Sequence, residues 1–170
     1  MASNIFLGLG SNEGERIDFL RKALHQIRKD AYCEIEKISS IYETKPYGVK
    51  EQDNFYNIVI KINSSYSLIE LFQKIKLIEK GIGRIKTYRW GPREIDIDIL
   101  FFEDLIYSDD RITIPHKDFL NREFVLAPMK EIAPEFVHPL LNKKISDLDK
   151  AEIKLIVNKY KADLLKTDEE

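Results

Sequence analysis

Apolar residues recur with strand-like and then helix-like spacing at the start of the chain. Residues 5–9 form a short apolar run that ends at Gly10-Ser11-Asn12, which is typical of a buried strand leading into a helix. Ser11 or Asn12 is a plausible N-cap for that helix. The apolar positions that follow have helical spacing: Ile17, Leu20, Ala23, Leu24 and Ile27. The pattern predicts a strand followed by an amphipathic helix.

Two further strands and a long loop are predicted between residues 33 and 63. Residues 33–42 are rich in β-branched and aromatic side chains, and the polar run ETKPYGVKEQDN after them is expected to be a loop. The run FYNIVIKIN alternates as a strand requires. One face would carry Tyr56, Ile58, Ile60 and Ile62, and the other Phe55, Asn57, Val59 and Lys61.

A second helix and a fourth core strand come next. Ser67 and Glu70 have the spacing of a capping box, and the apolar stripe after them ends at Gly81 and Gly83, where we expect the helix to stop. A loop over residues 84–94 then leads into the strand IDIDILFF.

The order strand, helix, strand, strand, helix, strand is the split β-α-β pattern of a ferredoxin-like fold. We therefore expect an α+β protein with a β-α-β-β-α-β core, an antiparallel sheet and an added hairpin, in which LIY returns after a turn at Glu103-Asp104. The runs NREFVLAPMKEIAP and KAEIKLIVNKYKADLLK predict extra C-terminal helices. We expect one domain over residues 1–150, with residues 151–170 as its helical extension.

Length, composition and charge restrict the possible functions. A chain of 170 residues fits one domain of about 100–200 residues. No apolar stretch approaches the roughly 18 residues of a membrane span and the start lacks a signal-peptide pattern, so we expect a cytoplasmic protein with no membrane partner. The net charge of −2 provides no basic field for nucleic acid. Cys33 is the only cysteine, which excludes an internal disulfide.

Two acidic residues within RWGPREIDIDILFF are the strongest candidates for chemistry. The strand period places Ile95, Ile97 and Ile99 toward the core, so Asp96 and Asp98 point together to the other side. Their Cα atoms should lie about 6.5–7 Å apart. Oxygen ligands without Cys or His favour Mg²⁺, which commonly combines one or two carboxylates with substrate phosphates and water.

A solvated acidic strand face is the alternative interpretation of this alternation. Basic side chains nearby favour the metal site, because polyphosphate binding requires them: Arg84, Lys86, Arg89 and Arg93. No GxxxxGK[ST] loop occurs, so side chains and metal would hold any nucleotide. Phosphoryl or pyrophosphoryl transfer needs positioning and charge neutralisation rather than a nucleophilic side chain. His116 alone would be structural more often than catalytic, but Arg111 and Arg122 favour a position beside an anion.

Several motifs occur together in the order of a known family: GLGSN, Thr-x-Pro-x-Gly in the long loop, FYN, RWGPREIDIDIL, and later PH and NR-x-F. On these residues the chain resembles the 6-hydroxymethyl-7,8-dihydropterin pyrophosphokinases of folate biosynthesis over nearly its whole length. The resemblance implies transfer of the β,γ-pyrophosphoryl group of ATP to the pterin hydroxymethyl group, with release of AMP. The implied partners are two small molecules, ATP and hydroxymethyldihydropterin, and we expect a monomer.

The resemblance also implies roles on the nucleotide side. Asp96 and Asp98 would hold two Mg²⁺ ions that bridge the ATP phosphates, and such a pair of ions can stabilise both the entering and the leaving oxygen. Arg84 and Arg93 would neutralise the transferred group. The other nucleotide-side positions are Glu79, Lys86, Trp90, Ile99, Arg111, Thr113, His116 and Arg122.

On the pterin side, the ring would lie between Phe55 and Phe124, with its edge against Asn57. Backbone groups of Thr44, Lys45 and Tyr47 would also contact the edge of the pterin. Ordinary core packing is the alternative role of the two phenylalanines. The chain departs from the commoner family pattern in having a lysine at four positions, which are Lys45, Lys76, Lys86 and Lys117.

Two other functions remain open at this stage. One is a different metal-dependent phosphotransfer enzyme with the same acidic and basic residues, from which Phe55, Asn57 and Phe124 would distinguish this chain. The other is a non-catalytic ferredoxin-like module, which would have no use for a basic loop before the acidic strand.

Overall fold

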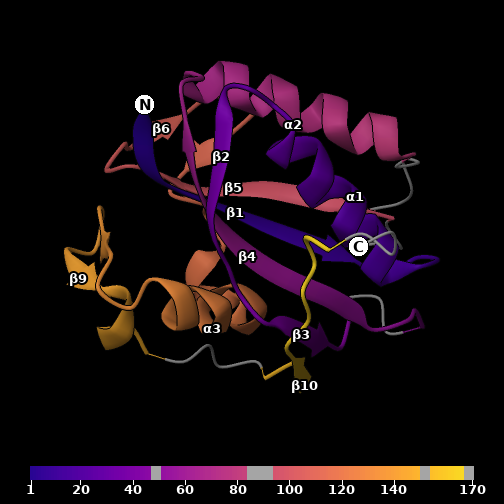
Figure 1. Cartoon of the computed structure of the whole chain (residues 1–170). Helices are drawn as coiled ribbons and strands as arrows, with labels where there is room; N and C mark the ends of the chain where they lie inside the picture. Colours follow the sequence, from indigo (N-terminus) through magenta and orange to yellow (C-terminus); the bar gives the residue numbers. More distant parts are fainter. Residues whose placement is uncertain (47–50, 84–93, 150–153, 167–170) are drawn as a thin grey trace.

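An antiparallel sheet forms the centre of the molecule, described here from a computed structural model (Figure 1). The structure describes residues 1–46, 51–83, 94–149 and 154–166. The strands run in the order β10-β3-β4-β1-β5, and β2 also pairs with β4. Their bounds are Ala2–Ser11 for β1, Cys33–Ile38 for β2, Ile41–Thr44 for β3, Phe55–Ser64 for β4, Asp96–Phe102 for β5 and Ile156–Tyr160 for β10.

Helices cover both faces of this sheet (Figure 1). Helices α1, Arg16–Arg28, and α2, Leu68–Ile82, lie on one face, and α3, Glu123–Ile132, lies on the other. Alternation along β4 divides the core as predicted: Ile58 and Ile60 pack with α1 and α2, whereas Val59 packs with α3. The ferredoxin-like α+β class is confirmed, with α3 as an addition to the β-α-β-β-α-β core.

Helix ends match the sequence signals only in part. The capping box of α2 is present, since Ser67 Oγ accepts from the Glu70 N–H and the Glu70 carboxylate accepts from the Ser67 N–H. Gly83 ends this helix with φ of 105°, a left-handed conformation that favours glycine. The predicted N-cap of α1 is wrong, because Ser11 belongs to β1 and Glu15 occupies the cap position.

The predicted strand over residues 33–42 is in fact two strands that both pair with β4. Ser39 separates them and replaces part of the ladder: its N–H donates to the Val59 carbonyl, and its Oγ accepts from the Val59 N–H at 2.9 Å. Because the Ser39 side chain satisfies the backbone hydrogen bonding at this break, the apolar pattern of the sequence does not reveal it.

The added hairpin also differs from the prediction. LIY does not pair with β5; instead β6, Tyr107–Ser108, pairs with β7, Thr113–Ile114, as a separate two-stranded sheet. A second short pair follows α3 and consists of β8, Val137–His138, and β9, Lys143–Lys144. Two 3₁₀ turns, Phe119–Asn121 and Ile145–Asp147, flank α3.

The helix predicted for the C-terminal run is wrong. Ile156–Tyr160 is a strand that pairs with β3, whose outer edge would otherwise expose unpaired backbone groups. Val157 and Tyr160 of the supposed apolar stripe are each 42% exposed. Residues 156–160 therefore extend the central sheet rather than forming a helical extension.

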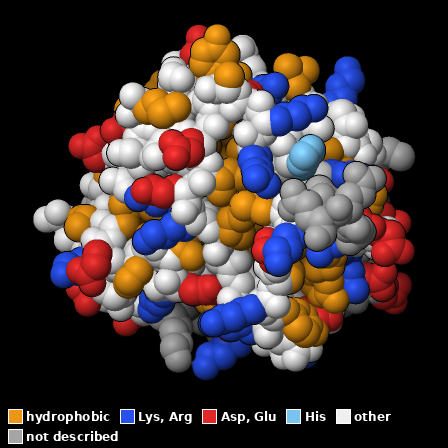
Figure 2. Space-filling view, in the orientation of Figure 1, with side chains coloured by type: hydrophobic (Ala, Val, Ile, Leu, Met, Phe, Trp, Pro, Cys, Tyr) orange, Lys and Arg blue, Asp and Glu red, His pale blue; other side chains and the backbone are white. Residues whose placement is uncertain are grey.

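The surface in Figure 2 carries acidic and basic side chains interspersed, with apolar side chains between them, several of which adjoin near the middle of the view. This agrees with a net charge close to zero. Among the helices that the structure describes, none has the length and apolarity of a membrane span.

Candidate active site

The two acidic residues of β5 lie beside the glycines of β1. Burial of Ile95, Ile97 and Ile99 in the core fixes the opposite orientation for Asp96 and Asp98. In the β1 ladder Gly8 is paired with Asp98, and Gly10 with Asp96. Gly8 and Gly10 line one cavity together with both carboxylates.

A cavity on this face contains the residues expected to bind the pterin. Thr44, Lys45, Phe55, Asn57 and Phe124 line it together with both acidic residues. The rings of Phe55 and Phe124 are half-buried rather than fully packed in the core. The structure therefore brings the predicted aromatic pair and the acidic pair to one cavity.

The side-chain amide of Asn57, which lines this cavity, is held in a defined orientation. Asn57 is 7% exposed, and its Nδ2 donates to Thr44 Oγ1 at 2.7 Å. Its Oδ1 lies against Gly10, where an added Cβ would come within 2.5 Å of that oxygen. Gly10 is thus required by close approach, a constraint that the sequence alone did not reveal.

A second cavity, of about 300 Å³, lies on the other side of Asp98. Four of the predicted nucleotide-side residues line it, which are Ile99, Arg111, Thr113 and His116. Lys76 and Phe72 of α2 line it as well. Arg122 instead lines the first cavity, with its Nη1 3.7 Å from Asp98 Oδ2. Asp98 is the acidic residue that lines both cavities.

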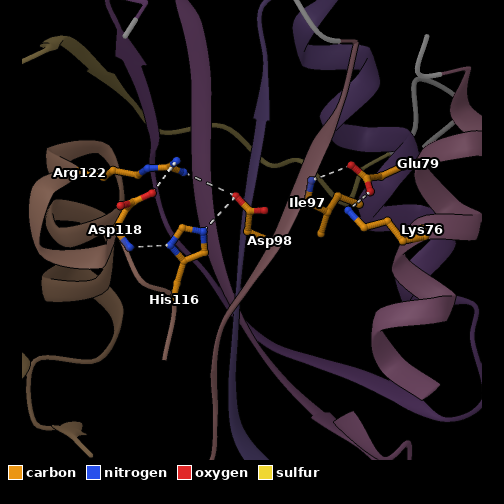
Figure 3. A network of polar contacts seen from close by, with 7 residues as sticks. All are labelled: Lys76, Glu79, Ile97, Asp98, His116, Asp118 and Arg122. Carbon is orange, nitrogen blue, oxygen red and sulfur yellow. Dashed lines mark hydrogen bonds and ion pairs between the residues drawn. The ribbon is translucent and has the colours of Figure 1, made fainter. Parts of the chain in front are cut away.

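Arg122 and His116 both contact Oδ2 of Asp98, and they lie on the same side of it in Figure 3. Burial, followed by the neighbouring Asp96 carboxylate, raises the pKa of Asp98 to about 7, against the opposing charges of Arg122 and Lys76. A divalent cation would stabilise the ionised form of Asp98 beside its neighbouring carboxylate.

His116 is held as a neutral hydrogen-bond donor (Figure 3). Burial, with the nearby Arg122 charge, lowers the pKa of His116 to about 4. Its Nδ1 accepts from the Asp118 backbone N–H at 3.2 Å. The proton of the neutral ring is therefore assigned to Nε2, which lies 3.9 Å from Asp98 Oδ2.

Glu79 supports β5 from α2 (Figure 3). Its side chain is buried, and Oε2 accepts from the Ile97 N–H at 3.2 Å, between the two acidic residues. Oε1 accepts from Lys76 Nζ at 2.9 Å. Glu79 thus holds both the strand backbone and the lysine that faces the second cavity.

Arg111 is oriented by Asp109. Its Nη2 donates to Asp109 Oδ2 at 2.8 Å, and the Tyr107 hydroxyl donates to the same oxygen at 2.7 Å. These hydrogen bonds, that of Tyr107 first, hold the pKa of Asp109 well below its usual range. The sequence search missed Asp109, although an acidic residue two positions before a candidate arginine was a signal for such a pair.

Five predicted site residues lie outside the described residues: Tyr47, Arg84, Lys86, Trp90 and Arg93. Their roles stay predictions. Among the described residues, no three or more His, Cys, Asp or Glu side chains are grouped to hold a metal. His138 has a structural role, because its Nδ1 accepts from the Leu140 and Leu141 N–H groups.

Comparison with known proteins identifies relatives along most of the chain. Residues 6–134 match the family described as 7,8-dihydro-6-hydroxymethylpterin-pyrophosphokinase. A 2-amino-4-hydroxy-6-hydroxymethyldihydropteridine pyrophosphokinase of Aquifex aeolicus is 41% identical over 85% of this chain and 89% of its own length. The protein of the same name from Bacillus subtilis is 38% identical over 76% of this chain and 78% of its own.

Some relatives are much longer. Folic acid synthesis protein FOL1 of Dictyostelium discoideum is 39% identical over 81% of this chain, which spans 21% of that protein. Among solved structures, a Plasmodium falciparum HPPK-DHPS triple mutant superposes with a TM-score of 0.69 at 18% identity. The match covers 87% of this chain and 43% of that one, and it supports the fold.

Proposed function

The chain belongs to the 7,8-dihydro-6-hydroxymethylpterin-pyrophosphokinase family, and from this premise we propose that it transfers the pyrophosphoryl group of ATP to the hydroxymethyl group of 6-hydroxymethyl-7,8-dihydropterin. The products would be AMP and the pterin diphosphate, within folate biosynthesis. The hydroxymethyl oxygen would lose its proton to solvent and bond to the β-phosphorus. The bond from that phosphorus to the α–β bridging oxygen would break, and the bridging oxygen would leave with AMP. Positioning and charge neutralisation are the main requirements of such a reaction.

One observation carries this proposal: Asp98 lines both cavities. A flat ring between Phe55 and Phe124 and a nucleotide against Arg111 and His116 would meet at the acidic pair. That arrangement supports transfer between two bound substrates, whereas a solvated acidic face would need neither cavity. A non-catalytic module is therefore disfavoured.

Asp96 and Asp98 are the residues proposed to hold Mg²⁺, with two ions as the family resemblance implies. The donor set fits, because neighbouring carboxylates whose charges repel each other gain from a shared divalent partner. When bound, Mg²⁺ would supply charge neutralisation for the polyphosphate.

The remaining side chains would bind and orient the substrates. Lys76 and Arg111 face the second cavity as cations for the nucleotide, and His116 offers a hydrogen bond from Nε2 rather than acting as a base. Arg84 and Arg93 keep their predicted role at the transferred group. On the pterin side, Asn57 would contact the ring edge because Thr44 holds its amide in place.

The test is AMP release from ATP with Mg²⁺, in the presence and absence of hydroxymethyldihydropterin. We expect AMP to form only with the pterin, and Asp96→Ala or Asp98→Ala to reduce turnover at least about a hundredfold, roughly 2.7 kcal/mol of barrier. Asp104→Asn, at an exposed turn, is the control and should leave turnover unchanged. AMP release without pterin would contradict the proposed acceptor, and turnover of the Asp variants within tenfold of wild type would contradict the metal assignment.

A further inference from the structure

Leu155, just before β10, connects two walls of the first cavity, which is lined by Phe55 and Phe124 and is called the aromatic cavity below. Its carbonyl accepts from the Lys45 N–H at 2.9 Å, and its N–H donates to Glu123 Oε2 at 2.7 Å. Lys45 follows the end of β3, and Glu123 begins α3. Each of these two residues is therefore next in sequence to a residue that lines the cavity, Thr44 or Phe124.

The two aromatic rings are carried by the elements that Leu155 joins. Phe55 lies on β4 and is paired with Thr44 of β3, whereas Phe124 lies in the first turn of α3. In Figure 1, β10 lies beside β3, near α3. The path from Phe55 through Thr44, Lys45, Leu155 and Glu123 to Phe124 consists of hydrogen bonds and consecutive residues.

A separate pair of hydrogen bonds holds the other end of α3 to the sheet. Glu131 accepts from the Ser40 N–H at 2.9 Å and from the Tyr42 hydroxyl at 3.0 Å. Glu131 is eight positions after Glu123, about 12 Å along a helix. Of these two carboxylates, Glu123 is the one nearer the rings in sequence, and its hydrogen bond is charge-assisted.

We propose that Leu155 and Glu123 are positioning residues that set the separation of Phe55 and Phe124 and thereby the affinity for the pterin. The inference rests on the proposed function. It assigns a role in substrate binding to a C-terminal segment that lies beyond the family match at residues 6–134. An aromatic sandwich binds a flat ring well only within a narrow range of ring separations, so loosening one wall should weaken binding of the ring and spare the nucleotide.

The test compares variants at Glu123 by calorimetry, with the pterin titrated in the presence of Mg²⁺ and a non-hydrolysable ATP analogue. Glu123→Ala should weaken pterin binding about fivefold to tenfold, where tenfold equals about 1.4 kcal/mol. Binding of the ATP analogue alone should change less than about twofold. Glu123→Gln should restore pterin affinity, because its amide oxygen can still accept from the Leu155 N–H.

Tyr160→Phe is the matched control. It removes a 3.0 Å hydrogen bond from the other end of β10 to the Glu43 carboxylate, and it should leave pterin affinity unchanged. The inference would be overturned if Glu123→Ala lost affinity equally for both ligands, or if its pterin affinity were unchanged. A wild-type protein that binds no pterin would contradict the proposed function instead.

A second pair of variants applies if Glu123→Ala does not fold. Lys45→Pro removes the N–H that donates to Leu155, whereas Lys45→Ala removes only the side chain. We expect pterin affinity to be at least about threefold lower in Lys45→Pro than in Lys45→Ala. Equal affinities in these two variants would also overturn the inference.

Discussion

Individual side chains owe their chemistry here to neighbours from distant parts of the chain. Asp98 has a raised pKa because it is partly buried beside Asp96, and His116 is neutral because it is largely buried beside Arg122. Asn57 has a defined amide orientation because Thr44 accepts from it. Each of these properties is set before substrate arrives, which reduces the reorganisation needed on binding.

The pKa of Asp98 is the first prediction at this scale. In the metal-free protein the Asp98 carboxyl should titrate near pH 7, protonated below and ionised above. Asp96→Asn should lower this pKa, because it removes a neighbouring negative charge. Mg²⁺ with an ATP analogue should lower it as well, because a cation binds the ionised form. Carboxyl NMR over pH 4 to 9 measures all three, and a wild-type pKa below 5 would contradict the account.

The aromatic cavity gives the second prediction. Phe124→Ala should weaken pterin binding about tenfold or more, since it removes one side of the ring contact. Its matched counterpart is Phe72→Ala, which removes a ring from the second cavity. This variant should weaken binding of the ATP analogue rather than binding of the pterin. Calorimetry with each ligand separates the two effects. If either variant lost affinity equally for both ligands, the assignment of one cavity to the pterin and the other to the nucleotide would be contradicted.

At the scale of elements, ties between helices and strands hold the site in place. Glu79 links α2 to β5, and Glu131 links α3 to the start of β3. Asp30, after α1, accepts from the Tyr32 N–H at 2.8 Å and from the Tyr66 hydroxyl at 2.9 Å, with Lys74 Nζ of α2 at 3.3 Å. A few hydrogen-bonded carboxylates thus fix how the helices meet the sheet.

Asp30 provides a prediction about stability. Burial raises its pKa, but the hydrogen bonds from Tyr32, Tyr66 and Lys74 outweigh this effect and lower the pKa overall. A folded pKa below the unfolded value means that the contribution to stability is present above about pH 4 and is lost as the pH falls through the folded pKa.

We therefore expect Asp30→Asn to lower the free energy of unfolding by about 1–2 kcal/mol at pH 7. The difference from wild type should shrink when both are measured near pH 3. Urea denaturation gives both values, with Glu34→Gln on the exposed side of β2 as the control. A deficit that stays constant across this pH range would argue against the ionised carboxylate as its source.

At the scale of the whole molecule, the two cavities meet at one acidic residue, Asp98. We predict that the active species is a monomer of 20.0 kDa. Light scattering after gel filtration should give this mass, and specific activity should not depend on enzyme concentration. Activity that falls on dilution together with loss of a larger species would contradict this prediction.

The sequence by itself determined the order of the core elements, the faces of β4 and β5, and the family. These features depend on spacing between near neighbours, such as the alternating isoleucines that point Asp96 and Asp98 away from the core. The apolar spacing of residues 153–164 also fitted a helix, although the strand β10 forms there. That segment was decided by the open edge of β3, which local spacing does not describe.

Only the tertiary structure decided the pairing of β6 with β7, the meeting of both cavities at Asp98 and the link through Leu155. It also set the pKa values of Asp98 and His116, which depend on burial and on charges distant in the sequence. Residue types and their periods are local, whereas backbone pairing at sheet edges and the desolvation of charge depend on what the rest of the chain brings alongside.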